Sequence, residues 1–414
     1  MNKITLLITA LILNFSMAIS QSCLPDGITF TTQEEIDNFQ SDYPGCTAIE
    51  GFVTIRGYDE ITNLNGLSVL TSVGGTLEFY SCAVLTSLSG LENLTYIGGD
   101  LEVYMWPSGT SVLTNLTGLN NLTTIGGGLN ITNTDVLSGL TGLENVPSIG
   151  GFLQIAGNEA LTNLSGLDNL TSIGGEIWIG ENTALTDLSG LGNLTSVGGD
   201  FEIYESSLSS LNGLGKLSTI GGVFKINYSD HLTDLSGLGR LHSIGGNMEI
   251  YSNEALTSLA GLDSIAPASI SEIYIRYNPL LSTCQVKSVC DYLASPTGDV
   301  TISDNATGCN SQQEVEDACN ALSVENIISG NEFTIAPNPF SDQAVLSLNP
   351  AIYKSINIRI FNTLGFCVKN RKFEGIQTGQ TQFLLDMHGI PSGIYFCRLQ
   401  IGNKTTTKKL VKVK

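Results

Sequence analysis

Residues 153–175 read LQIAGNEALTNLSGLDNLTSIGG, and near-copies of this stretch fill the middle of the chain. Each copy ends in a Gly-Gly pair that follows Ile or Val, and successive pairs lie 24, 28, 24, 24, 24, 23 and 24 residues apart. The first glycines of these pairs are Gly74, Gly98, Gly126, Gly150, Gly174, Gly198, Gly221 and Gly245. A fixed period of this length is typical of a solenoid, in which each copy stacks on its neighbours.

Two apolar periods alternate inside each copy. Apolar residues recur at every third position from Leu161 to Ile173, and Ile177 and Ile179 then alternate with other residues. A period of three fits neither a helix nor a strand, so we expect a chain that coils around a central core. The alternating segment is a strand that pairs in parallel with its equivalents, at a spacing of about 4.8 Å. We therefore predict an all-β, leucine-rich-repeat-like β-helix of about ten rungs over residues 51–282.

Two further features of the copies have a structural interpretation. The Gly-Gly pair predicts a corner that needs either a positive φ or close packing of backbones. It lacks the following helix that a phosphate-binding loop requires. Four asparagines lie three residues before a Leu, where stacked side chains can satisfy backbone groups at a turn: Asn158, Asn182, Asn253 and Asn278.

The pattern I-G-G-x-L-x-I…N-x-x-L-x-x-L-x-G-L resembles the receptor L domain family, roughly over residues 23–320. The resemblance implies that the β-helical solenoid is right-handed and that it serves binding or adhesion. It carries no ligand over to this chain.

The first 20 residues predict an export signal. Lys3 precedes an apolar stretch from Ile4 to Phe15, and Ala18 and Ser20 are the small residues of a cleavage site. The stretch is too short to span a membrane, and no later segment reaches 18 apolar residues. We therefore expect an exported protein without a transmembrane span, in a compartment where disulfides can form.

Six of the nine cysteines lie at the two ends of the repeats. Cys23 and Cys46 lie in an N-terminal cap, residues 21–50, and four more lie in a C-terminal cap, residues 283–322. The spacings do not suit zinc, so we predict disulfides. The four C-terminal cysteines allow three connectivities, of which we favour Cys284–Cys309 and Cys290–Cys319. Cys82 has no partner within the repeats, and residues 312–321 have the pattern of a short amphipathic helix.

Charge marks a second domain. Residues 1–330 contain 7 Lys+Arg and 35 Asp+Glu, whereas residues 331–414 contain 11 and 4, so the net charges are −28 and +7. The total of −21 argues against a nucleic-acid partner. We place a linker at 323–332 and a small β-sandwich at 333–414, with strands at 344–348, 356–361, 383–386, 394–400 and 408–413. Cys367 and Cys397 either lie on paired strands and form one disulfide or stay free.

Four segments of this domain form a recognisable series: APNPF at 336–340, FNTLG at 361–365, GIYF at 393–396 and the basic end KKLVKVK at 408–414. In this order they resemble the type IX secretion C-terminal sorting domain, and the resemblance implies an Ig-like sandwich. The resemblance implies that the secretion machinery and a sortase-like peptidase are partners. It also implies a secreted or outer-membrane surface-attached protein of a Gram-negative bacterium.

The sequence offers little for catalysis. It contains no G-x-S-x-G or H-E-x-x-H motif, so we expect a protein that is not an enzyme, without a cofactor. The alternative is a carbohydrate-active enzyme on the same β-helix, a polysaccharide lyase or hydrolase. Residues 21–330 hold only six Lys+Arg, a poor supply for an anionic substrate.

Two columns of residues are predicted to point outward from the sheet. The aromatic residues of these columns, with Trp106 of a four-residue insertion at 106–109, are candidates for binding a neutral glycan or a protein: Tyr80, Tyr104, Trp106, Trp178, Tyr204 and Tyr251. Glu78 and Glu102 lie one rung apart and could share a Ca²⁺ ion. The competing interpretation is that these aromatics only favour strands.

Overall fold

The computed structural model describes residues 21–106, 111–325, 333–348, 355–374, 382–401 and 404–414. The predicted signal peptide therefore lies outside the described residues, as do residues 107–109 of the insertion and 326–332 of the linker. The chain divides into two compact units, residues 1–309 and 310–414.

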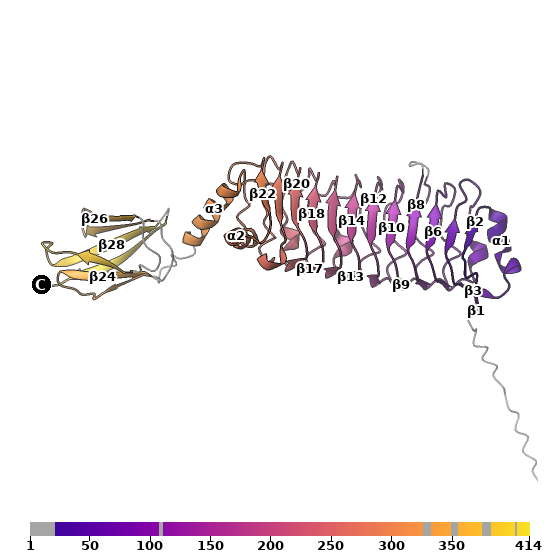
Figure 1. Cartoon of the computed structure of the whole chain (residues 1–414), viewed down its shortest axis with the longest axis horizontal. Coiled ribbons are helices and arrows are strands. Elements are labelled where there is room, and N and C mark those ends of the chain that lie inside the picture. The colour runs from indigo at the N-terminus through magenta and orange to yellow at the C-terminus, as the bar shows by residue number, and fades with distance from the viewer. Residues whose placement is uncertain (1–20, 107–110, 326–332, 349–354, 375–381, 402–403) are drawn as a thin grey trace, which may run out of the picture. The chain divides into compact units, whose positions relative to one another are not determined.

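The first unit is a solenoid with two parallel sheets, whose strands alternate along the chain (Figure 1). The larger sheet has twelve strands: β2 Ile28–Phe30, β4 Val53–Ile55, β6 Leu77–Tyr80, β8 Leu101–Tyr104, β10 Leu129–Thr132, β12 Leu153–Ala156, β14 Ile177–Gly180, β16 Phe201–Tyr204, β18 Phe224–Asn227, β20 Met248–Tyr251, β21 Ile273–Arg276 and β22 Val300–Ser303. The smaller sheet has ten: β1 Gln21–Cys23, β3 Cys46–Ile49, β5 Ser72–Val73, β7 Tyr96–Ile97, β9 Thr124–Ile125, β11 Ser148–Ile149, β13 Ser172–Ile173, β15 Ser196–Val197, β17 Thr219–Ile220 and β19 Ser243–Ile244.

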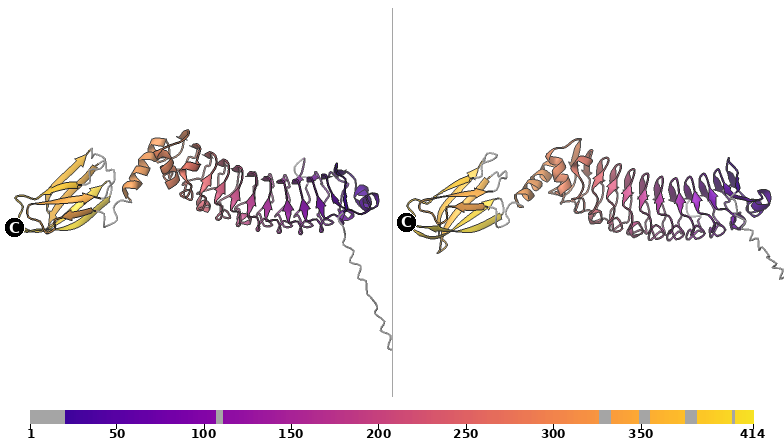
Figure 2. Two further views of the ribbon diagram at one scale, coloured as in Figure 1. Left: turned by 60° about the horizontal axis from the view of Figure 1, so that its bottom comes forward. Right: turned by 90° about the horizontal axis from the view of Figure 1, so that it is seen from below.

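The third side of each rung is a loop, and Figure 2 shows the rungs stacked one on the next. Short 3₁₀ turns occur in three of these loops: η1 Asn65–Leu67, η2 Ser189–Leu191 and η3 Ser236–Leu238. A fourth, η4 Pro267–Ser269, lies instead beside Ile244 of the last short strand, where Ile244 N–H donates to Oγ of Ser269. The solenoid prediction is confirmed, with a strand in the cap on each side of the expected repeats. β2 and β22 lie in residues 21–50 and 283–322, which the sequence had placed outside the rungs.

The apolar residues that recur at every third position point inward, as predicted. The five apolar residues from Leu161 to Ile173, together with Ile177 and Ile179, are all buried. Removing such a side chain from water stabilises the folded state by about 1.5–3 kcal/mol. One rung cannot enclose these residues alone, so each rung depends on the rungs that stack against it.

The Gly-Gly pairs serve close backbone packing. Gly174 does not have a positive φ, and a Cβ atom there would lie 2.1 Å from the carbonyl oxygen of Gly150 on the preceding rung. The same contact recurs along the stack, for example between Gly198 and Gly174. A positive φ is instead found in the loop that precedes the pair, at Gly166 (108°).

The asparagines form the predicted ladder. The Asn158 side-chain amide donates to Oδ1 of Asn182 at 3.1 Å, and the Asn182 amide donates to the carbonyl of Ile155 at 2.9 Å. Asn253 and Asn278 repeat this arrangement at 3.0 Å. All four side chains are buried, so the ladder satisfies backbone carbonyls that water does not reach.

A helix and disulfides close the ends of the stack. Helix α1, Gln33–Asp42, buries Ile36 and Phe39. The predicted Cys23–Cys46 and Cys284–Cys309 bonds are present. The first unit also contains helix α2, Lys287–Ala294, which the sequence did not predict.

The remaining cysteines of the repeats and caps behave as expected. Cys290 and Cys319 are the other two disulfide-bonded cysteines of the chain. Cys82 is free and buried, and its Sγ contacts the carbonyl of Ile55 at 3.2 Å.

The second unit begins with helix α3, Gln312–Glu325, where the short helix was predicted. Two antiparallel sheets follow, with strand orders β23-β24-β27 and β26-β25-β28-β29. Their strands are β23 Phe333–Ala336, β24 Gln343–Leu348, β25 Ser355–Asn362, β26 Cys367–Glu374, β27 Gln382–Asp386, β28 Gly393–Ile401 and β29 Lys404–Lys412. Buried residues of both sheets, such as Leu346 and Ile358, share one core, which makes this unit a sandwich.

The Cys367–Cys397 pairing is wrong. Cys367 is exposed, Cys397 is buried, and both thiols are free. Strand β25 lies between β26 and β28, so the two cysteines belong to strands about 10 Å apart. A disulfide needs Cα atoms within about 7 Å.

Candidate binding face

The outward residues of the twelve-stranded sheet form the two predicted columns. In the strand register Glu78 pairs with Glu102 and Tyr80 with Tyr104, and the same register continues along the sheet to β22. Most of these side chains are half-buried. Each column therefore presents a continuous row of side-chain surface along the stack.

The first aromatic group on this face is the N-terminal aromatic cluster, which we define as Tyr80, Tyr104 and Trp106. The rings of Tyr80 and Tyr104 lie 5.6 Å apart at an interplanar angle of 41°. The Arg56 guanidinium lies over the Tyr80 ring at 4.4 Å, a cation–π contact that holds the ring in place.

Trp106 is 58% exposed, although its backbone is anchored. Its N–H donates to Oγ of Ser81 at 3.1 Å, and the same hydroxyl donates to the Trp106 carbonyl at 2.6 Å. The rest of the predicted insertion lies outside the described residues. An exposed indole on an anchored backbone is a suitable contact for a partner.

Two carboxylates adjoin this cluster. Glu78 accepts a hydrogen bond from Oγ1 of Thr54 at 2.9 Å. Burial and the neighbouring charges of Glu78 and Asp100 raise the pKa of Glu102. Within the described residues, no group of three or more His, Cys, Asp or Glu could hold a metal ion. Ca²⁺ takes about six to eight oxygen ligands, more than this pair offers, and calcium stays a prediction of the sequence.

The second group is the C-terminal aromatic row, which we define as Trp178, Tyr204, Tyr228, Tyr251 and Tyr277. Trp178 stacks on Tyr204 with ring centroids 6.4 Å apart. Tyr228 then meets Tyr204 at 5.7 Å and Tyr251 at 6.0 Å, both edge to face. The Arg276 guanidinium continues the row, 6.0 Å from the Tyr251 ring and 5.6 Å from the Tyr277 ring.

Sequence reasoning missed Tyr228 and Tyr277. Each follows the last residue of its strand, and each has a left-handed backbone, with φ of 54° and 57°. Both side chains are exposed, at 46% and 53%. The sequence shows that every copy has a residue at this turn. A tyrosine at that position does not indicate that its backbone is left-handed, because bulky residues seldom adopt this conformation.

Charged groups lie beside the row. Lys225 pairs with Glu202 at 2.8 Å and lies 5.8 Å from the Tyr251 ring. The Tyr204 hydroxyl donates to Glu205 at 2.7 Å, and this hydrogen bond raises the pKa of Tyr204 to about 12. The row is thus fixed by contacts among its own members and their neighbours.

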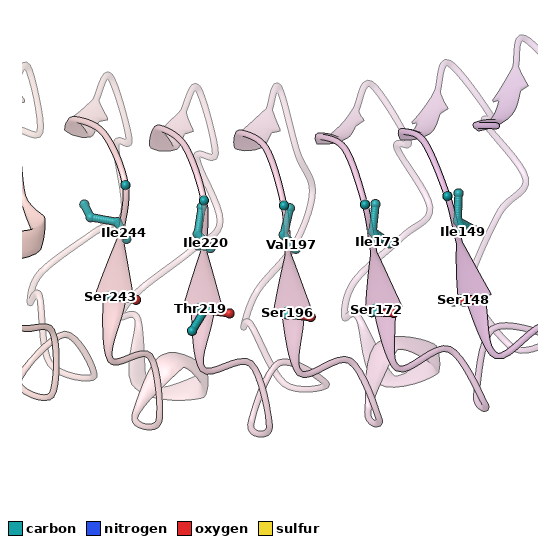
Figure 3. A pocket seen from close by; sticks show the side chains of 15 residues that line it. Ser148, Ile149, Ser172, Ile173, Ser196, Val197, Thr219, Ile220, Ser243 and Ile244 are labelled. Carbon is teal, nitrogen blue, oxygen red and sulfur yellow. The ribbon is translucent and has the colours of Figure 1, made fainter. Parts of the chain in front are cut away.

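The ten-stranded sheet offers a different surface. A shallow groove of about 700 Å³ runs along five of its short strands, lined by Ser or Thr, Ile or Val, and Gly from each copy. Figure 3 shows Ser148, Ser172, Ser196, Thr219 and Ser243 repeating along it. No aromatic or charged side chain lines this groove. The groups suited to recognition therefore lie on the twelve-stranded sheet and the loops that follow it.

In the C-terminal sandwich, the motif near the start of the domain pairs with the last strand. The Asn338 amide donates to the carbonyl of Lys409 at 2.9 Å, and Val411 N–H donates to Oδ1 of Asn338 at 2.8 Å. Phe340 N–H donates to the Val411 carbonyl, and Val413 N–H donates to the Phe340 carbonyl. The APNPF and KKLVKVK segments therefore form one structure.

The buried Lys412 side chain stabilises this structure through a set of hydrogen bonds, which we call the Lys412 lock. Its side chain is only 6% exposed. Nζ donates to Oδ1 of Asp342 at 2.9 Å and to the carbonyls of Met387 and Ile390 at 2.9 and 2.8 Å. These three hydrogen bonds use all three ammonium protons.

Comparison of the sequence with known protein families agrees with this arrangement. Residues 334–414 match the family model of the secretion system C-terminal sorting domain. The chain ends in a type IX sorting domain. It is therefore a secreted or surface-attached protein of a Gram-negative bacterium, and its sorting domain interacts with the secretion machinery.

Residues 45–116 and 121–186 match the receptor L domain model, so both predicted resemblances are confirmed. The rung geometry continues past the second match as far as Ser303. No curated protein matches the chain. None of the helices in the described residues is long and apolar enough to cross a membrane.

Proposed function

We propose that the exported solenoid is a non-enzymatic binding or adhesion module that recognises a glycan or protein partner outside the cell. The observation that carries this proposal is the pair of aromatic groups anchored on one side of the stack. Tyr and Trp offer large contact surfaces at a low cost in conformational entropy, and with Arg they are enriched where proteins bind partners.

The N-terminal aromatic cluster offers a direct test. The changes Tyr104→Ala and Trp106→Ala should weaken binding to glycans or cells and leave the melting temperature nearly unchanged. Tyr96→Ala is the matched control, because Tyr96 is also exposed, at 45%, but lies on the ten-stranded sheet. A sharp fall in melting temperature would assign the rings to the fold, and normal binding would exclude the cluster from the site.

We also propose that a sortase-like peptidase removes the sorting domain during export. The charge step near residue 330 and the start of β23 at Phe333 favour a cut between the acidic solenoid region and the basic sorting domain. Mass spectrometry of the surface protein should find no peptide that contains Lys414. Deleting residues 408–414 should leave the protein in the periplasm, and normal secretion of that variant would contradict the sorting role of this segment.

One observation favours a second candidate, a glycoside hydrolase. Glu78 and Glu102 lie on adjacent strands, about 4.8 Å apart along the stack, and the pKa of Glu102 is raised. A carboxyl with a raised pKa beside a second carboxylate is the arrangement of a glycosidase acid and its partner. A depolymerisation assay separates the candidates, because turnover that Glu102→Gln abolishes would support the enzyme and binding without turnover supports the module.

A further inference from the structure

We infer that the groove between Tyr228 and Tyr277 binds a sugar unit of a glycan that carries no negative charge. The inference rests on the proposed binding function and names the ligand class of a particular site. The groove measures about 450 Å³ and is lined by residues of four successive copies: Tyr228, Asp230, Ser252, Glu254, Tyr277, Pro279 and Asp304.

The shape of the groove comes from one column of left-handed residues. Tyr228, Ser252 and Tyr277 occupy the same position after strands β18, β20 and β21, with φ of 54°, 55° and 57°. The small Ser252 leaves a gap between two large rings, which stand two rungs apart, about 10 Å. Bulky side chains seldom adopt this backbone conformation, so two tyrosines here form an unusual pair of walls.

Both rings are supported by neighbours. Tyr228 has edge-to-face contacts with Tyr204 and Tyr251, and Tyr277 has the Arg276 guanidinium at 5.6 Å. A supported ring loses little conformational freedom when a ligand binds. Such rings can pack against the C–H faces of a pyranose.

The three carboxylates of the groove are hydrogen-bond acceptors. Asp230 accepts from the Glu254 N–H at 3.3 Å, and Asp304 accepts from the Ser303 hydroxyl at 2.8 Å. Among the described residues, the ion pairs of the chain are made elsewhere and include none of Asp230, Glu254 and Asp304. A carboxylate has about four acceptor positions, so these groups keep capacity for sugar hydroxyls or an amino-sugar ammonium.

Charge and size decide the ligand class. The lining contains three carboxylates and no Lys or Arg, so it repels a uronate or a sulfated sugar. The Arg276 guanidinium lies against the Tyr277 ring and is not part of the lining. A specific protein interface uses about 20–30 residues on each side, whereas this groove is lined by seven. A non-anionic glycan suits both the rings and the acceptors.

The test is a glycan array carrying neutral, amino-sugar and uronate or sulfated chains, probed with the secreted protein. We expect binding to neutral and amino-sugar chains, and at least a tenfold loss in Tyr228→Ala and Tyr277→Ala. Ser252→Tyr should give the same loss, since it fills the gap with a side chain that both neighbouring rungs accept. Glu254→Gln should weaken amino-sugar binding more than neutral binding.

Tyr96→Ala is again the control and should bind as the unchanged protein does. The inference fails if the protein selects anionic chains, or if the groove variants bind normally while the unchanged protein still binds glycans or cells. In that second case the proposed function survives. An unchanged protein that binds no glycan, protein or cell removes the proposed function as well.

Discussion

In the solenoid, Gly174 packs against the backbone of Gly150, and the same contact recurs from rung to rung. In the sorting domain, Lys412 makes three hydrogen bonds in a single place. The first region is stabilised by many copies of a few contacts, and the second by contacts that have no equivalent elsewhere. The difference teaches that a repeat can be recognised by its period, whereas the sandwich is recognised by motifs whose partners lie far apart in the chain.

We expect the largest effect on stability when a methyl group is added at one of the repeated glycine contacts between rungs. Gly174→Ala places a Cβ atom 2.1 Å from a backbone oxygen, and neither rung can move without disturbing the next one. We expect a loss of about 3 kcal/mol in the free energy of unfolding, at the upper end of overpacking effects. Gly215→Ala is the control, because nothing lies within 4 Å of the new Cβ atom. Equal melting temperatures for the two variants would contradict the packing role.

The second largest effect is expected when the Lys412 hydrogen bonds of the sorting domain are removed. Lys412→Met keeps the apolar stem but leaves the Met387 and Ile390 carbonyls without their donor, at a cost of about 1–3 kcal/mol. We expect the protein to accumulate in the periplasm, as measured by cell fractionation. Lys414→Met, at an exposed position, should be exported normally. Export of both variants would show that this lock is not needed for sorting.

The same lock has a pH dependence. The hydrogen bond from Lys412 lowers the pKa of Asp342. A lowered carboxyl pKa contributes stability above the unfolded pKa, and this stability is lost as the pH falls below about 4. Lys412→Met should remove this part of the acid sensitivity of the sorting domain, as measured by thermal unfolding of the full chain between pH 3 and pH 7.

A smaller effect distinguishes two positions of one solenoid column. Burial and its carboxylate neighbours raise the pKa of Glu102, whereas Glu202 has Lys225 at 2.8 Å. Glu102→Gln should therefore raise stability at pH 7 by a few tenths to about 1 kcal/mol, and Glu202→Gln should lower it by a similar amount. The gain at Glu102 should vanish below about pH 4, where the carboxyl is protonated in both states. Changes of the same sign at both positions would contradict this assignment.

The last prediction requires no mutation. Cys367 is exposed, whereas Cys82 and Cys397 are buried, and burial raises the pKa of these two thiols to about 11 and about 12. Thiol labelling of the native full chain should therefore modify Cys367 alone, and the exported form without its sorting domain should not be labelled. Labelling of Cys82 in the native protein would mean that the rungs around it open.

The columns of the twelve-stranded sheet were predictable because the alternation around Ile177 and Ile179 is strict and the copies are nearly equal in length. The Cys367–Cys397 error arose because strand order in an antiparallel sandwich depends on contacts distant in sequence. Strand β26 was missed because it is a polar edge strand. The groove at Tyr228 was missed because a left-handed backbone and a small residue on the next rung are visible only in three dimensions.

The glycine contact also bears on how such a protein changes over generations. Each rung offers its successor the same backbone surface that it receives from its predecessor, so recombination between copies can add or remove whole rungs without a new interface. Two strands, β10 and β12, separate Tyr104 from Trp178 in the sheet. Gaining or losing one copy there would change the distance between the two aromatic groups in steps of about 4.8 Å. The number of copies between Tyr104 and Trp178 therefore sets the distance between the two aromatic groups.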